Sequence, residues 1–315
     1  MTRVWFHRPP AGCHAVRGEL VHQVQQALQA AGHHPGALDG VFGSQTEAAL
    51  RAYQTEQRWL PTGAVDAKTW LHLVGPEPPG LQARWWEADF EGHSFTKVAG
   101  NVDGAGLTYG IIGFTLASGS LQRVLTEVRD RSLHHLTAAV GPFTPKLLQV
   151  LDAPRAEQLR WAQGLSQGRG GIEVHPVWAA AFRLLGRQAE VQTIQLAHVQ
   201  PYWERALADA TRCHLSTELG LALCFDIAVQ HGGINSRDQP RIQERIEAST
   251  STTEQDHRVI IAGVVAEHSQ SAWRDTVQRR QLTLATGRGE VKQAAYDLAS
   301  WGLAEVLAAG GVPCA

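Results

Sequence analysis

The sequence has few features of a membrane protein, a disulfide-rich domain or a nucleic-acid-binding protein. Its longest apolar stretch, residues 215–229, is too short to span a bilayer comfortably and contains Glu218 and Asp226, so it predicts a buried helix. The four cysteines show no CxxC spacing, which argues against a cysteine zinc site or a disulfide framework. Lys and Arg total 28 against 30 Asp and Glu, so no basic field would hold a polyanion. We therefore expect no membrane insertion and no nucleic-acid partner.

The amino terminus also has no apolar run of signal-peptide length, because Arg3, His7 and Arg8 interrupt it. We expect a chain made in the cytoplasm without a signal peptide. With 315 residues, 43% of them hydrophobic, it can bury a substantial core. Ten Trp against one Met is an unusual ratio, and Trp is common where a protein grips the flat apolar faces of sugar rings.

Residues 74–80, with three prolines and two glycines, break any helix and mark a domain boundary. Apolar spacing before it predicts three short helices, around 20–28, 48–53 and 68–73. We expect a three-helix domain over residues 1–78 and a larger domain over residues 79–315.

The larger domain is predicted to be mainly α-helical with a small β component, an α+β fold. Residues 95–115, rich in Gly and β-branched residues, predict a short sheet or hairpin, and 141–171 predicts a loose, Gly/Pro-punctuated lobe. Helical periodicity or composition is found over residues 81–90, 121–128, 177–185, 201–213, 215–230, 241–248, 257–267, 272–284 and 291–307.

A turn-rich string in the small domain, GALDGVFG over residues 36–43, repeats loosely as TGAVD over residues 62–66. Asp-Gly provides a tight turn and Ser44 can cap the next helix, so local structure explains most of these residues. From Gln25 to Leu73 the pattern resembles the bacterial peptidoglycan-binding domain. The resemblance implies anchoring to the cell wall through a shallow groove, with Asp39 and Phe42 as binding residues. The alternative is a structural dock for the second domain.

Two carboxylates flank a glycine-rich turn in the second domain: Glu91 at a predicted helix end and Asp103 before Gly104. Cleavage of a glycosidic bond needs an acid to protonate the leaving oxygen and a carboxylate to activate water or stabilise positive charge. This pair fits both roles. Taken alone, however, an Asp-Gly turn and a solvated Glu are ordinary features.

The wider string, DGAGLTYGIIGF over residues 103–114, resembles the lysozyme-like superfamily and most closely the chitosanases of glycoside hydrolase family 46. The resemblance implies an inverting glycosidase in which Asp103 is the base and Thr108 helps to hold the attacking water. The catalytic acid is less clear because its spacing to the Asp is shorter than in the chitosanases. Glu91 is preferred, and Glu87 one turn earlier is the competitor.

The apolar helix around Asp226 resembles the buried central helix of the same enzymes, in which an Asp belongs to an arginine network that reaches the catalytic acid. A charge in such a helix must be paired or protonated. Arg274 is the first candidate partner, with Arg279 and Arg280 as alternatives. A simple tether between two helices would explain Asp226 equally well.

The adjacent histidines His33-His34 and His134-His135 should point apart on a helix and have no carboxylate motif beside them. We therefore expect no metal and no cofactor. Trp85, Trp86 and Tyr109 lie near the two carboxylates, and Trp86 and Tyr109 are the candidates for stacking on a sugar, although Trp at helical spacing more often lies in a core.

Together these features predict a monomeric cell-wall hydrolase that cleaves β-1,4 bonds in the glycan strands of peptidoglycan. A chitosanase and a non-catalytic wall-binding protein are the alternatives. Without a signal peptide, such a protein would reach the wall through a separate pore, as a phage endolysin does, or through a secretion apparatus.

Overall fold

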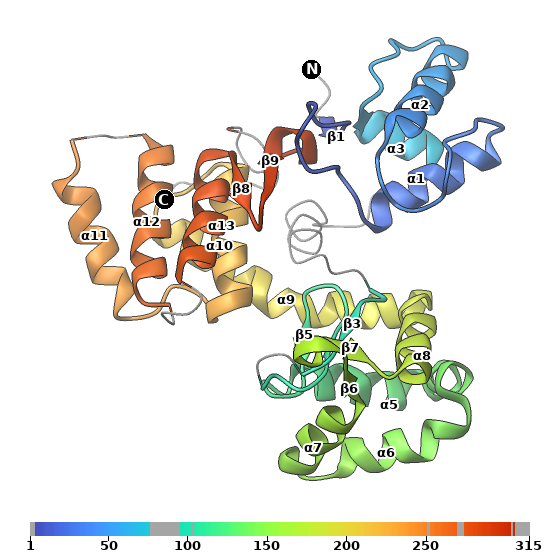
Figure 1. Ribbon diagram of the computed structural model, residues 1–315. Coiled ribbons are helices and arrows are strands. Elements are labelled where there is room, and N and C mark those ends of the chain that lie inside the picture. The colour runs from blue at the N-terminus through green and yellow to red at the C-terminus, as the bar shows by residue number, and fades with distance from the viewer. Residues whose placement is uncertain are drawn as a thin grey trace. The chain divides into compact units, whose positions relative to one another are not determined.

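The computed structural model describes residues 4–75, 95–101, 104–250, 253–269, 274–303 and 305. Within them the fold is mainly α-helical with four small antiparallel sheets (Figure 1), which confirms the predicted fold class. The chain divides into two compact units, one of residues 1–87 with 202–315 and one of residues 88–201. Among the described residues, no helix combines the length and apolar character needed to cross a membrane. The predicted helix over residues 81–90 and most of the predicted proline-rich boundary lie outside the described residues.

The N-terminal part of the first unit is the predicted three-helix bundle. Buried apolar side chains from each helix form its core, including Leu28, Leu50 and Trp70. The strand β1 pairs antiparallel with β2, directly before the third helix, where Asp66 caps the helix by accepting a hydrogen bond from the Thr69 backbone at 2.7 Å. The elements are β1 (Val4–Phe6), α1 (Glu19–Ala30), α2 (Ser44–Glu56), β2 (Val65–Asp66) and α3 (Ala67–Leu73).

The C-terminal part of the first unit is a helical bundle whose helices were mostly predicted from periodicity. The helix α10 is buried along nearly its whole length, and α12 and α13 pack against it and against each other. The elements are α10 (Glu218–His231), α11 (Asp238–Ala248), α12 (Glu254–Glu267) and α13 (Arg274–Thr286). The helix α9 (Ala189–Arg212) contributes residues to both units, and the boundary along the chain falls between Pro201 and Tyr202.

The prediction that α9 begins at Pro201 is wrong, because the helix starts twelve residues earlier and Pro201 lies inside it. A proline there removes one backbone hydrogen bond. The buried side chains of Val191, Ile194 and Val199 lie in the earlier segment. Tertiary packing of this apolar face outweighs the lost bond, which local sequence could not show.

The predicted C-terminal helix over residues 291–307 is also wrong. The described part of this segment contains a β-hairpin of β8 (Arg288–Val291) and β9 (Ala294–Asp297), followed by the 3-10 helix η3 (Leu298–Trp301). The turn residues Lys292 and Gln293 adopt left-handed conformations, with φ of 51° and 68°, which reverse the chain in two residues. Neither residue type favours that region, so the sequence carried no turn signal.

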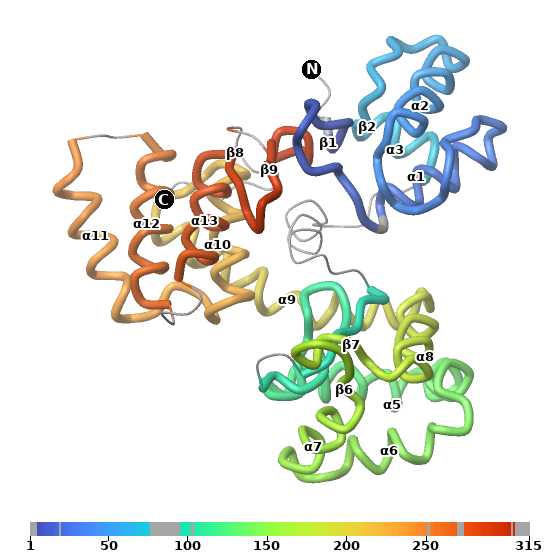
Figure 2. The backbone as a smooth tube through the Cα atoms, in the orientation of Figure 1, coloured from blue at the N-terminus to red at the C-terminus, as the bar shows by residue number. Residues whose placement is uncertain are grey.

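This hairpin packs against the N-terminal segment of the same unit, as Figure 2 shows. The His14 backbone N–H donates to the Ala295 carbonyl at 2.6 Å, and the His7 N–H donates to the Ser300 carbonyl at 3.0 Å. The His14 ring lies 4.8 Å from that of Tyr296. The N-terminal segment that precedes α1 is therefore in direct contact with β9 and η3.

The second unit contains the predicted small sheet. Its three strands, in the order β3-β4-β5, are Val98–Ala99, Thr108–Tyr109 and Phe114–Thr115. The helix α5 (Ser120–Val140) follows the sheet, and α8 (Pro176–Gly186) packs against α5. The first residues of α9 complete the unit.

The predicted loose lobe over residues 141–171 is instead largely helical. Pro145 lies in the first turn of α6 and Pro154 is the N-cap residue of α7, so these prolines start helices rather than break them. The elements are η1 (Gly141–Phe143), α6 (Thr144–Asp152), α7 (Arg155–Leu165), β6 (Ser166–Gln167), η2 (Arg169–Gly171) and β7 (Glu173–Val174).

Candidate active site

Thr108, the predicted water-holding residue, lies on the central strand of the three-stranded sheet. It pairs with Ala99 on one side and Thr115 on the other, and its side chain is partly exposed. A hydroxyl on a strand paired on both edges is held in a fixed position. Asp103, Glu91, Glu87 and Trp86 lie outside the described residues.

Asn101 and Gly106, which flank Asp103 in the sequence, are bonded to each other. Asn101 Oδ1 accepts a hydrogen bond from the Gly106 backbone N–H at 3.0 Å. The Asn101 backbone N–H donates to Ser166 Oγ at 2.8 Å, and Asn101 Nδ2 donates to Gln163 Oε1 at 2.5 Å. The end of α7 and the start of β6 therefore hold Asn101 against the rest of the unit.

Position 106 favours glycine for two reasons. Its φ is +75°, and a Cβ atom there would lie 2.8 Å from Leu159 Cδ2 on α7. Gly106 therefore packs directly on this helix. A side chain at position 106 would be strained at this φ and would force the Leu159 side chain to shift.

The buried Gln195 of α9 bonds to the backbone next to the sheet, at one position before β3 and one between β4 and β5. Its Oε1 accepts from the Ile111 backbone at 3.0 Å, and its Nε2 donates to the Phe95 carbonyl at 3.1 Å. Sequence reasoning missed Asn101, Gln163, Ser166 and Gln195. Apart from the Asn101–Gly106 contact, the hydrogen bonds described here join residues 62 to 100 positions apart in the sequence. A local sequence pattern does not indicate such distant partners.

Tyr109, a candidate for sugar stacking, is fully buried. Its ring packs on Phe182 with centroids 4.9 Å apart, and burial raises the pKa of its hydroxyl far above the ordinary value. The ring has no face open to solvent in this structure. Its position supports the sheet that carries Thr108.

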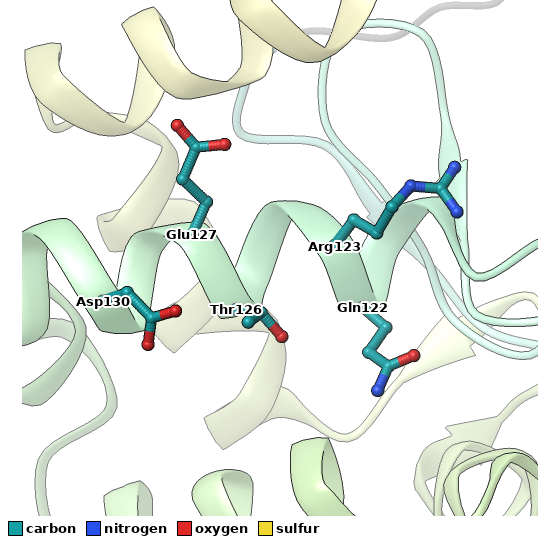
Figure 3. A pocket seen from close by; sticks show the side chains of 5 residues that line it. All are labelled: Gln122, Arg123, Thr126, Glu127 and Asp130. Carbon is teal, nitrogen blue, oxygen red and sulfur yellow. The ribbon is translucent and has the colours of Figure 1, made fainter.

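A surface pocket lies along α5, the helix that follows the sheet in the sequence. All of its lining side chains project from this helix (Figure 3). Glu127 accepts hydrogen bonds from Arg131 at 2.7 Å and pairs with His198 of α9 at 2.8 Å. Burial alone would raise the pKa of Glu127, but these contacts outweigh it and lower the pKa below the ordinary value. The pocket is lined by Gln122, Arg123, Thr126, Glu127 and Asp130, none of which was predicted as a site residue.

In the first unit, Asp226 is fully buried on α10 and forms an ion pair with Arg280 of α13. Arg280 was one of the three arginines left open by the sequence. The preferred candidate, Arg274, lies exposed at the first residue of α13, six residues before Arg280 along the helix. The structure therefore assigns the partner role to Arg280 in place of Arg274.

The predicted groove residues of the N-terminal bundle have structural roles. The Asp39 carboxylate accepts from the Val41 backbone at 2.9 Å and from Gln25 at 3.2 Å, and the Val41 bond is the main reason that the pKa of Asp39 is lowered. Phe42 is buried, with its ring edge against Phe6 at 5.7 Å. Of the pair, only Asp39 is exposed to a ligand.

The half-repeat seen in the sequence has a common internal structure. In the first half, buried Gln25 accepts from the Gly40 backbone at 2.8 Å and donates to Thr46 at 3.1 Å. In the second half, buried Gln54 accepts from the Gly63 backbone at 2.9 Å. Each glutamine closes the Gly-containing turn of its own half, which explains why the motif repeats.

Comparisons with known proteins agree with this organisation. Residues 86–259 match glycosyl hydrolase family 46, and the chain belongs to this family. It is therefore a glycoside hydrolase. Residues 17–73 match a peptidoglycan binding domain.

Similar solved structures are chitosanases. The family 46 chitosanase of Gynuella sunshinyii, solved with chitotetraose, is 17% identical with a TM-score of 0.47, over 70% of this chain and 99% of that chain. The native chitosanase of Bacillus subtilis MY002 is 20% identical with a TM-score of 0.43, over 65% of this chain and 85% of that chain. No match is found among curated proteins.

Proposed function

We propose that this glycoside hydrolase cleaves the β-1,4 glycosidic bonds of peptidoglycan. The observation that carries the proposal is the presence of a peptidoglycan binding domain in the same chain as the hydrolase, over residues 17–73. Tethering a catalytic domain to a module with affinity for the same polymer raises the local substrate concentration. The glycan strands of the wall are then the partner of both parts of the chain.

Charge gives weaker support to the same substrate. The second unit, residues 88–201, carries ten Lys and Arg against nine Asp and Glu. It therefore has no excess of acidic residues of the kind that would attract a cationic polymer such as chitosan.

In the proposed mechanism, Glu91 protonates the leaving glycosidic oxygen while Asp103 takes a proton from the attacking water. Thr108 orients that water. Inversion requires room for water between the carboxylates, which are then about 6.5–9.5 Å apart. The position of Thr108 on the paired strand and the bond between Asn101 and Gly106, which flank Asp103 in the sequence, support these roles, because catalytic groups must be held in fixed geometry.

Chitosan is the second candidate substrate. The observation in its favour is membership of family 46, whose chitosanases have the same motif over residues 103–114. A chitosanase that carries a wall-binding module would still be a glycosidase with the same catalytic residues. The two candidates therefore differ in substrate and not in chemistry.

Conservative variants test the catalytic assignment. Glu91→Gln should abolish release of reducing ends from purified sacculi and leave the circular dichroism spectrum unchanged, whereas Glu87→Gln, the matched control, should stay active. Asp103→Asn should be as inactive as Glu91→Gln. The reverse result for the two glutamates would transfer the acid role to Glu87.

Proton NMR of fresh product should show the inverted anomer, and a retained anomer would overturn the role of Asp103.

A further inference from the structure

The second unit holds two helices, α5 and α9, that are joined by two histidine–glutamate pairs. Glu127 on α5 meets His198 on α9, with 2.8 Å between carboxylate oxygen and imidazole nitrogen. Eight residues further along α5, His135 faces Glu190, eight residues earlier on α9, at 3.9 Å. The reversed order shows that the helices run antiparallel. The first pair is closed by a hydrogen bond and the second is not.

A second imidazole lies at the open pair. The ring of His134 is 3.9 Å from that of His135, centroid to centroid, with 45° between the ring planes. Consecutive side chains on a regular helix point about 100° apart. Here α5 is kinked at Ser132, where φ is −142° and ψ is 43°, and the two rings that follow lie together. The expectation from sequence that these histidines point apart and have no carboxylate partner is therefore corrected.

The ligand atoms of this cluster are close together and available. One nitrogen from each of His134 and His135 and one Glu190 oxygen all lie within 4.8 Å of one another. Within the described part of the chain, neither imidazole has a hydrogen bond, whereas His198 and His268 both bond to a carboxylate or an arginine. The side chains of His135 and Glu190 are 27% and 37% exposed, so an ion can enter from solvent.

We propose that His134, His135 and Glu190 form a binding site for a divalent transition metal ion of the zinc type. Two imidazoles and one carboxylate are a common ligand set for zinc, with metal–ligand distances of about 2.0–2.2 Å and a fourth position for water. Rotation of the side chains would draw the three atoms inward onto one ion. The carboxylate oxygen and the two imidazole nitrogens can each offer a lone pair, so the cluster suits a cation rather than an anion.

The ion would link the second half of α5 to the first turn of α9. A ligand that binds only the folded state stabilises that state in proportion to its concentration relative to the dissociation constant. The site therefore predicts a zinc-dependent increase in the thermal midpoint. This inference is independent of the proposed function.

Calorimetric titration of the full-length, tag-free, EDTA-treated protein with ZnCl₂ tests the site, together with thermal unfolding at each zinc concentration. We expect one equivalent of zinc to bind wild-type protein and raise its thermal midpoint. Glu190→Gln and His135→Ala should each weaken binding at least tenfold and remove the shift. His198→Ala, which breaks the closed pair on the same two helices, should keep zinc binding.

If His135→Ala fails to fold, the conservative Glu190→Gln variant still tests the site. Equal zinc affinity in wild type and in Glu190→Gln would place any bound zinc elsewhere and overturn the proposal. The absence of binding to wild-type protein at millimolar zinc would overturn it too.

Discussion

Asp226 of α10 forms an ion pair with Arg280 of α13. The helix α10 is buried along almost its whole length. Removal of the arginine leaves a carboxylate in an apolar interior, where an uncompensated charge costs about 3–5 kcal/mol. Arg280→Met should therefore lower the free energy of unfolding by about that amount in urea titrations. Arg274→Met, at an exposed position of the same helix, should change it by less than about 0.5 kcal/mol.

The double variant Asp226→Leu with Arg280→Met separates charge from packing. It should recover much of the stability lost in Arg280→Met, because no buried charge remains. Equal stability of Arg280→Met and wild type would show that the pair does not stabilise this bundle.

Asn101→Ala should reduce kcat on the glycan substrate by about 10- to 100-fold, because it removes the bond between the two residues that flank the proposed base Asp103. The thermal midpoint should change little, since Asn101 is partly exposed. Gln163→Ala is the matched control: it removes the partner on α7 but keeps the bond to Gly106, and should cost less activity. Full activity of a folded Asn101→Ala variant would mean that catalysis does not need this bond.

The stability contributed by Glu127 should depend on pH. Its pKa is lower in the folded state than the ordinary value of 4.5, so its ionised form stabilises the fold above that value, and this contribution is lost as the pH falls through the folded pKa. Urea unfolding of wild type and Glu127→Gln should show the full difference at neutral pH. The difference should close on acidification below 4.5. A difference that stayed constant to low pH would exclude an ionic contribution.

Gln293→Gly in the β8–β9 turn should stabilise the protein by about 0.5–1 kcal/mol, because the native φ of 68° is strained for a residue with a Cβ atom. Thermal unfolding measures the gain. Gln293→Ala removes the same side chain but keeps the Cβ atom, and should stay close to wild type. A lower midpoint for Gln293→Gly than for Gln293→Ala would contradict the assigned turn geometry.

Sequence predicted the parts of the fold that depend on local pattern. The glycine-rich motif placed Thr108 in a small sheet, and apolar spacing located the N-terminal bundle. The predictions were wrong where the structural role of a residue depends on its tertiary contacts. Pro145 and Pro154 could break or start a helix, and only packing shows that they start α6 and α7.

The residues that hold the candidate site could not be predicted for a related reason. Gln195 lies on a helix and bonds to the backbone of Ile111, 84 positions away, in the turn between β4 and β5. The residues around Gln195 in the sequence are those of an ordinary helix and do not indicate this contact. The choice among three arginines for Asp226 likewise depended on where α13 begins and how it rotates against α10. Such pairings arise from tertiary structure alone.

The most direct test of the proposed function is a parallel assay of the full-length protein on purified sacculi and on soluble chitosan, measured as new reducing ends per minute, with Glu91→Gln as the blank. We predict release from sacculi by wild-type protein and none by the variant, with little release from chitosan. Release from chitosan alone would make the chain a chitosanase, and binding to sacculi with no release from either polymer would contradict catalysis itself.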